Sequence, residues 1–137
     1  TNLTNNNEDF FHRVLSLSRL DEVIAKLPDG LDTIISESNQ ILSGGQKQCI
    51  GFARAFFKNR DILVLDEATN AMDRQLEIDL MNNLCNLKYK MVIAISHKSS
   101  MLEYFQKTCV LKNGKIQDYG LTSNLINKNK FLKKMAN

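Results

Sequence analysis

The spacing of apolar residues predicts that the chain begins with helices. Residues 4–7 are polar and rich in asparagine, which is typical of a loop or a frayed start. A helix is expected to begin at Glu8, with an apolar face made by Phe10, Phe11, Val14 and Leu15. Ser18–Asp21 fits a capping box for a second short helix, and Pro28–Gly30 predicts the turn that ends it. Residues 31–41 show no regular pattern.

The middle of the chain alternates between helices and strands. Almost every position from Gln46 to Phe57 is apolar or small, which predicts a helix that is buried on most sides. The continuous apolar runs Ile62–Leu65 and Met91–Ile95 predict strands of a parallel sheet with both faces covered. Between them, Asp73 can cap a helix whose apolar stripe is formed by Leu76, Leu80, Leu84 and Leu87.

A short helix near Ser99–Tyr104 and a hairpin are expected after the second strand. The strands 107–111 and 115–119 are joined by Asn113-Gly114, which favours a two-residue hairpin turn. Residues 121–135 have a helical pattern with several lysines. The order of elements predicts an α/β chain with a helical portion at its start.

Composition excludes several classes. The 137 residues suffice for one domain, and 43% apolar with 24% charged residues is ordinary for a globular protein. The net charge of +3 is too small to indicate nucleic acid as a partner. The lysines at 128, 130, 133 and 134 fit a solvated helix face, with an anionic surface as the alternative.

The cysteines and the termini add little chemistry. Cys49, Cys85 and Cys109 are widely spaced and form no C-x-x-C pair, so reduced cysteines in a cytosolic compartment are favoured. No apolar run has the length of a membrane span, and the N-terminus lacks the regions of a signal peptide.

Two acidic residues follow the first strand. Asp66 and Glu67 stand at its carboxyl end, which is where open α/β sheets bind ligands. Asp66 can hold a Mg²⁺ ion, and Glu67 can orient or deprotonate a water. The alternative is that both residues simply end the strand and cap a turn.

The run Leu42–Gln46 (LSGGQ) precedes a helix and predicts a phosphate-binding element. Its glycines allow a close approach of the backbone, and a helix N-terminus carries partial positive charge. By itself, Ser-Gly-Gly is also a common loop. His97 follows the second strand and could donate to a phosphate oxygen, or it could be an ordinary surface histidine. Asp73 could be only a helix cap.

Taken together, these motifs resemble those of ATP-binding cassette (ABC) proteins. LSGGQ is similar to their signature motif, Ile62–Glu67 to the Walker B strand with its catalytic glutamate, Ala71–Asp73 to the D-loop, and His97 to the switch histidine. Ala53-Arg54-Ala55 also fits the intervening helix, whereas Asn70 stands where a serine is common. The resemblance implies the C-terminal part of a P-loop NTPase (RecA-like) core. It places a helical subdomain at 1–58, the α/β core portion at 59–120 and C-terminal helices at 121–137.

The resemblance also implies ATP hydrolysis in a head-to-tail dimer of two nucleotide-binding domains. Catalysis falls to Glu67 and His97, Mg²⁺ to Asp66, and contact with the nucleotide or the partner domain to Ser43, Gly44, Gly45, Gln46 and Asp73. The implied cofactors are ATP and Mg²⁺. The other implied partner is the transmembrane domain of a transporter, and the implied location is the cytoplasmic face of the cell membrane.

The loop that would hold ATP within the same chain is not recognisable. A P-loop needs a glycine five residues before Gly-Lys-Ser/Thr. The only Gly-Lys pair is Gly114-Lys115, with Cys109 at the glycine position and Ile116 at the Ser/Thr position. The chain is therefore interpreted as a C-terminal fragment of a nucleotide-binding domain, and we expect it to be inactive alone.

Two other interpretations stay open besides a domain of an exporter. The stretch Leu27–Thr33 followed by Glu37 resembles exporters, in which a glutamate of this loop contacts the membrane-spanning domain. Chromosome-maintenance and DNA-repair ATPases share the signature and Walker B motifs, although they usually carry glutamate where this chain has Gln46. A non-catalytic interaction module is the third reading.

Overall fold

The computed structural model describes residues 5–36, 41–87, 89–129 and 131–133, with side chains from residue 8 onward. It divides into two compact units, Thr1–Ala94 and Ile95–Asn137, which are described in turn. The finer predicted boundaries at residues 58 and 120 stay predictions. None of the described helices combines the length and apolar character needed to cross a bilayer.

The first unit begins with the helices α1 (Asn5–Leu17) and α2 (Leu20–Ile24). Helix α1 begins three residues earlier than predicted, because extending an established helix adds a hydrogen bond for each residue that is fixed. The predicted capping box at Ser18 is wrong. The Ser18 hydroxyl donates backward to the Val14 and Leu15 carbonyls at 2.8 and 3.0 Å, so it closes α1. Arg19 precedes α2 with φ 58° and makes no side-chain cap.

The 3-10 turn η1 (Gly30–Asp32) and helix α3 (Gly44–Lys58) follow. Helix α3 was predicted to be buried on most sides, but only one face is buried, formed by Gly45, Cys49, Phe52, Ala53 and Phe56. Phe57 on the other side is 54% exposed. Asn59 ends α3 in the left-handed conformation (φ 44°), which asparagine adopts more readily than most residues. The predicted loop glutamate, Glu37, lies outside the described residues.

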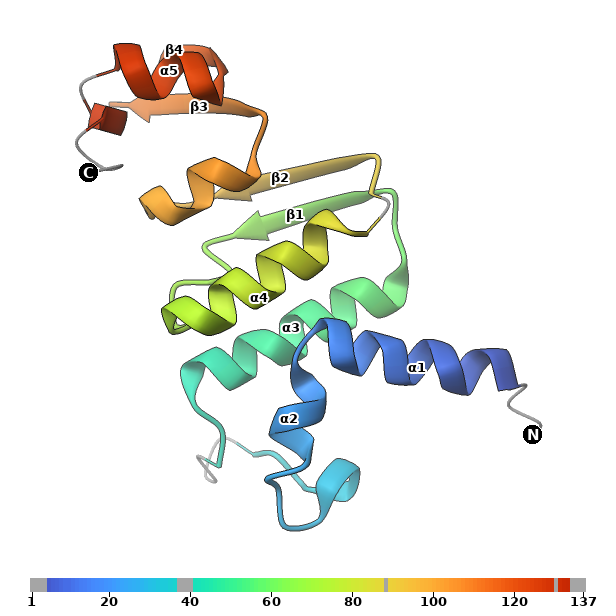
Figure 1. The fold of residues 1–137 in the computed structure, drawn as a ribbon. Helices are drawn as coiled ribbons and strands as arrows, with labels where there is room; N and C mark the ends of the chain where they lie inside the picture. Colours follow the sequence, from blue (N-terminus) through green and yellow to red (C-terminus); the bar gives the residue numbers. More distant parts are fainter. Residues whose placement is uncertain (1–4, 37–40, 88, 130, 134–137) are drawn as a thin grey trace. The chain divides into compact units, whose positions relative to one another are not determined.

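Strands β1 (Ile62–Asp66) and β2 (Met91–Ile95) are hydrogen-bonded neighbours that point the same way in Figure 1, joined through helix α4 (Arg74–Cys85). Helix α4 lies beside the strands, and α1 contacts α2, α3 and α4. The Asn83 side chain donates to the Leu17 carbonyl at 2.9 Å, so the end of α1 is tied to α4. The predicted strand–helix–strand order is confirmed, and Leu87 lies just beyond α4.

The prediction that both strands are covered on both faces is wrong for this chain. In β1, Leu63 and Leu65 are buried whereas Ile62 and Val64 are 55% and 59% exposed. In β2, Met91 is 53% exposed. A continuous apolar run indicates that a strand is suited to burial on both faces. In this unit the helices cover only one face of the strands, so the other face stays exposed.

The second unit contains the 3-10 turn η2 (Ser99–Tyr104), strands β3 (Lys107–Lys112) and β4 (Lys115–Leu121), and helix α5 (Thr122–Lys128). The predicted hairpin is confirmed: β3 and β4 are antiparallel, and both turn residues have positive φ, 51° at Asn113 and 71° at Gly114. Val110, Leu125 and Leu132 form its small core. The stretch predicted to be helical up to residue 135 contains α5 and a separate helical turn at residues 131–133. The Asn129 side chain caps the start of that turn by accepting from the N–H groups of Phe131 and Leu132, and residues 130, 134 and 135 lie outside the described residues.

Candidate functional site

The start of α3 carries the predicted phosphate-binding residues. Ser43 is the N-cap: its hydroxyl accepts from the Gln46 N–H at 3.2 Å, and the Gln46 side chain accepts from the Ser43 N–H at 2.8 Å. This reciprocal capping box fixes the first turn of the helix. The first N–H groups of a helix have no partner within it, so this turn is suited to an anion. Ser43 and Gly44 are exposed.

Both glycines of this turn lie against the segment Ala71–Met72, which precedes α4. A Cβ atom on Gly44 would meet the Ala71 Cβ at 2.9 Å, and one on Gly45 would meet the Ala71 carbonyl oxygen at 3.0 Å. The Gln48 side chain accepts from the Ala71 N–H at 3.2 Å. The glycines therefore have a packing role in addition to any contact with a phosphate.

We expect Gly45→Ala to destabilise the fold by about 1–3 kcal/mol, the usual cost of overpacking. The added methyl group would press on backbone atoms of residues 71 and 72, which cannot move as a side-chain end can. Gly51→Ala is the matched control on the same helix, because its Cβ would meet nothing within 4 Å. It should stabilise by about 0.5–1 kcal/mol. Thermal unfolding of both variants measures the difference, and equal melting temperatures would contradict the packing role.

The acidic pair lies at the end of β1. Asp66 is the last residue of the strand, and Glu67 follows with φ 47°, a left-handed conformation uncommon for glutamate. Both are exposed. The Asn70 side-chain amide donates to the Glu67 carboxylate at 2.7 Å, and the Asn70 N–H donates to the Glu67 carbonyl at 3.1 Å. Residues 67–70 therefore form a tight turn that begins at Glu67, the predicted base.

A buried polar contact anchors the same loop to α4. The Thr69 hydroxyl donates to the Glu77 carboxylate at 2.6 Å, and the two residues are only 2% and 3% exposed. The Asp73 carboxylate caps α4 by accepting from the Leu76 N–H at 3.0 Å, which confirms the predicted cap. The loop from Glu67 to Asp73 is thus fixed at its start, its middle and its end.

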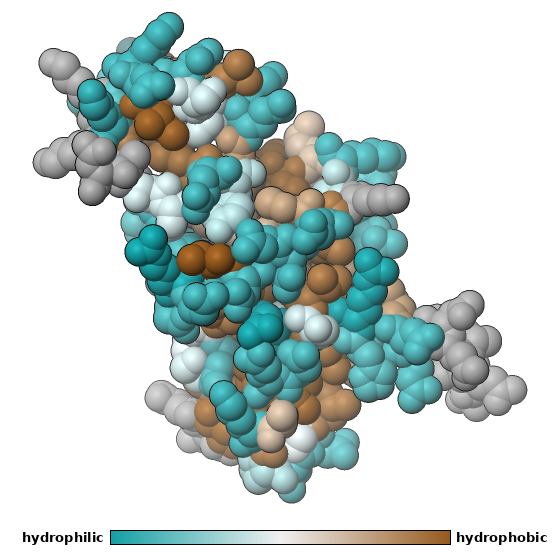
Figure 2. Space-filling view, viewed as in Figure 1, coloured by the Kyte–Doolittle hydropathy of each residue, from teal (hydrophilic) through white to brown (hydrophobic). Residues whose placement is uncertain are grey.

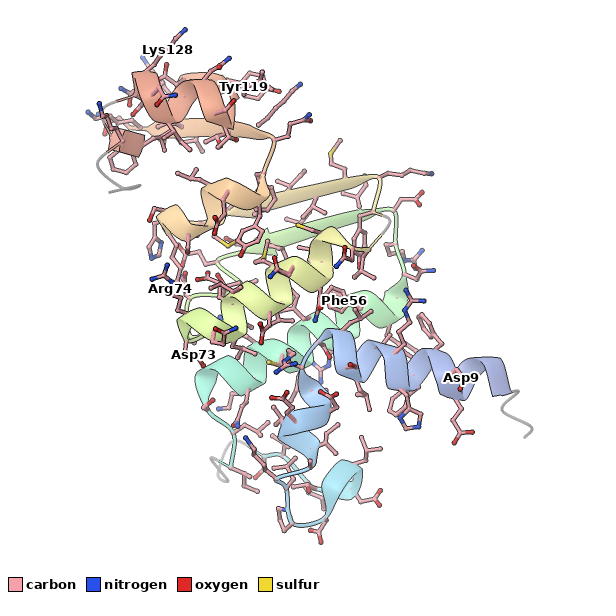
Figure 3. All side chains as sticks on the ribbon, in the orientation of Figure 1. Asp9, Phe56, Asp73, Arg74, Tyr119 and Lys128 are labelled. Carbon is pink, nitrogen blue, oxygen red and sulfur yellow. The ribbon has the colours of Figure 1, made fainter. Side chains whose placement is uncertain are left out.

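A hollow of about 300 Å³ lies between α2, the start of α3 and the start of α4, entirely within the first unit. Ser43, Gln46 and Asp73 line it. In Figure 3, Asp73 and Arg74 lie at the start of α4, next to the start of α3. On its α2 side, Arg19 pairs with Glu22 and, at 3.5 Å, with Asp79. Burial raises the pKa of the Cys49 thiol, so this lining cysteine stays protonated at neutral pH.

The structure places the predicted residues in three groups. Ser43, Gly44, Gly45 and Gln46 lie together with Asp73, and Asp66 and Glu67 start the loop that leads to it. His97 is exposed, follows β2 in a bend and belongs to the second unit. Two residues that contact the site, Gln48 and Asn70, were not among the predicted site residues. For Asn70 a signal was present, because it departs from the serine that is common at this place in the family whose motifs the sequence resembles.

The described residues fit a Mg²⁺ site in which water and phosphate oxygens fill most of the coordination positions. No group of three or more potential protein ligands occurs among the described residues. Mg²⁺ in nucleotide sites is commonly held by one or two carboxylates together with phosphate oxygens and water. Asp66 is an exposed carboxylate at a strand end, so it could supply one such ligand.

Parallel strands, an acidic pair at the end of β1 and a glycine-containing helix start define the class of nucleotide-binding domains. The ABC transporter family model matches residues 2–70. A lipid A-core flippase of Haemophilus ducreyi is 43% identical over 108 residues, which are 78% of this chain and 19% of that protein. ABC transporter B family member 4 of Dictyostelium discoideum is 39% identical over 124 residues, 90% of this chain and 16% of that protein.

Among solved structures, a bacterial Atm1-family ABC exporter with ATP bound superimposes with a TM-score of 0.84 at 29% identity, covering 93% of this chain and 23% of that one. The chain belongs to the ABC transporter family, and it is part of an exporter-type nucleotide-binding domain. It spans about a fifth of the length of the flippases that it matches.

Proposed function

We propose that this chain contributes to ATP hydrolysis by an exporter, and that its LSGGQ run serves a nucleotide held by a second nucleotide-binding domain. The observation that carries the proposal is the start of α3, where the capping box and the exposed residues Ser43 and Gly44 form an ordered helix N-terminus. Ser43, Gly45 and Gln46 would contact the phosphates of the opposing ATP, and Asp73 would couple the two domains.

The residues after β1 would act on the nucleotide of their own domain. Glu67 would orient and deprotonate the attacking water, and Asp66 would hold Mg²⁺, which when bound neutralises charge on the phosphates. His97 would donate to the terminal phosphate. In this proposal, catalysis rests on positioning and on charge stabilisation rather than on a covalent intermediate.

The geometry of Gly114-Lys115 supports a division of the site between two chain segments. This only Gly-Lys pair lies in the turn and first residue of the β3–β4 hairpin, and Gly114 has φ 71°. It is part of a hairpin turn rather than the start of a helix, which is where a phosphate loop is found. The phosphate loop would therefore come from outside these 137 residues.

A membrane partner is consistent with the surface of the first unit. Leu31, Ile34 and Ile35 are 60%, 81% and 45% exposed, and in the sequence they precede Glu37, which resembles the loop glutamate that contacts the membrane-spanning domain in exporters. Figure 2 shows apolar side chains at the surface in the lower part of the view, where the segment around residues 30–36 (cyan in Figure 1) lies. We propose that these residues pack against the transmembrane domain at the cytoplasmic face of the cell membrane.

A comparison of ATP turnover tests the proposal. The purified 137-residue chain should release no phosphate above background with ATP and Mg²⁺, because it would lack a phosphate loop. The complete protein that carries these residues should hydrolyse ATP. Magnesium-dependent turnover by the chain alone would overturn the divided site, and no turnover by the complete protein would overturn the function.

A further inference from the structure

We infer that Asn70 is a positioning residue for Glu67, the proposed base that deprotonates the attacking water. This inference rests on the proposed function. The Asn70 side chain donates to the Glu67 carboxylate oxygen Oε2 from Nδ2, at 2.7 Å. The backbone N–H of the same residue donates to the Glu67 carbonyl at 3.1 Å. One residue thus fixes both the backbone and the side-chain end of Glu67.

This restraint matters because Glu67 is an exposed glutamate, and a glutamate side chain has three rotatable bonds. Holding such a side chain in one rotamer has an entropic cost, and catalysis by a base depends on its placement relative to the water. A hydrogen bond to an ionised carboxylate is stronger than one between neutral groups. The Asn70 amide therefore restricts the carboxylate before the water arrives.

The loop is built to present this contact. Asn70 follows Thr69, which is 2% exposed and bonded to Glu77, so the backbone beneath Asn70 is anchored in the core. Asn70 itself is exposed, and its side chain is directed back along the turn to Glu67. A serine, common at this place in ABC proteins, has a shorter side chain and no amide, so it could not make this amide contact with the Glu67 carboxylate.

The test uses the complete protein with Asn70→Ala and Asn70→Asp. We expect Asn70→Ala to lower kcat by about three- to tenfold, as the modest net strength of an exposed hydrogen bond implies. The KM for ATP should not change. Asn70→Asp should lower kcat further, because a second carboxylate would repel Glu67. Asn82→Ala, at an exposed asparagine of α4, is the matched control and should behave as the parent.

A double-mutant cycle separates positioning from a general effect on the fold. In a Glu67→Ala background, Asn70→Ala should have no further effect on the residual turnover, because its action passes through the missing carboxylate. An equal loss in both backgrounds, or a raised kcat in Asn70→Ala, would overturn the inference. If Glu67→Ala itself leaves turnover unchanged, the proposed function fails instead.

Discussion

Replacing Glu67 by glutamine in the complete domain should lower ATP turnover by about 100-fold or more, the range attributed to a general base. Glutamine has nearly the same shape and keeps an acceptor oxygen, so ATP binding should be retained while the proton is no longer taken. The closed, nucleotide-bound dimer would then persist. Phosphate release and light scattering with and without ATP measure the two effects.

Glu103→Gln is the control for the loss of one negative charge. Glu103 is an exposed glutamate of η2 that the proposal does not use. This variant should hydrolyse ATP as the parent does. ATP-dependent dimerisation of Glu67→Gln no stronger than that of the parent would count against Glu67 as the base.

Ser43→Arg in the complete domain is expected to abolish closure of the dimer, and hydrolysis with it. The change removes the hydroxyl that caps α3, at a cost of about 1 kcal/mol. It also places a long cation at the exposed helix start that would face the opposing nucleotide. Turnover and ATP-dependent dimerisation should both fall to background, while binding of ATP to the monomer is retained.

Ser43→Thr is the companion variant, because threonine keeps a hydroxyl at the N-cap. It should fold like the parent and retain more turnover than Ser43→Arg. The melting temperatures of both variants show whether the helix start survives. Hydrolysis by a folded Ser43→Arg protein at the parent rate would contradict the role of this turn in the site.

Local signals in the sequence were sufficient to predict turns and helix starts where one or two residues determine the backbone conformation. Asn113-Gly114 predicted the hairpin turn because both positions need positive φ, and Asp73 predicted the start of α4 because its carboxylate caps the helix. The capping box predicted at Ser18 was wrong because a serine hydroxyl can either cap the helix that follows it or bond to carbonyls of the helix that precedes it. Ser18 is buried at the end of α1 and bonds to the Val14 carbonyl of that helix.

Burial was harder to predict than the elements themselves. The residues of β1 suit a strand covered on both faces, yet burial also depends on which other segments are present to cover it. Likewise, LSGGQ predicted an anion-binding helix start but not that Gly44 and Gly45 also pack on Ala71–Met72. The Asn70–Glu67 contact could not be read from spacing, because it depends on the left-handed backbone at Glu67.

The contact of the two glycines with Ala71–Met72 has a mechanical consequence for a dimer. In the proposed arrangement, the start of α3 contacts the ATP held by the partner domain. The loop that it touches begins at Glu67, the proposed base for the ATP of its own domain. Close-packed atoms transmit displacement instead of absorbing it. A shift of this helix on closing over one nucleotide would therefore be passed to the loop that serves the other, so the two hydrolysis events would not be independent in time.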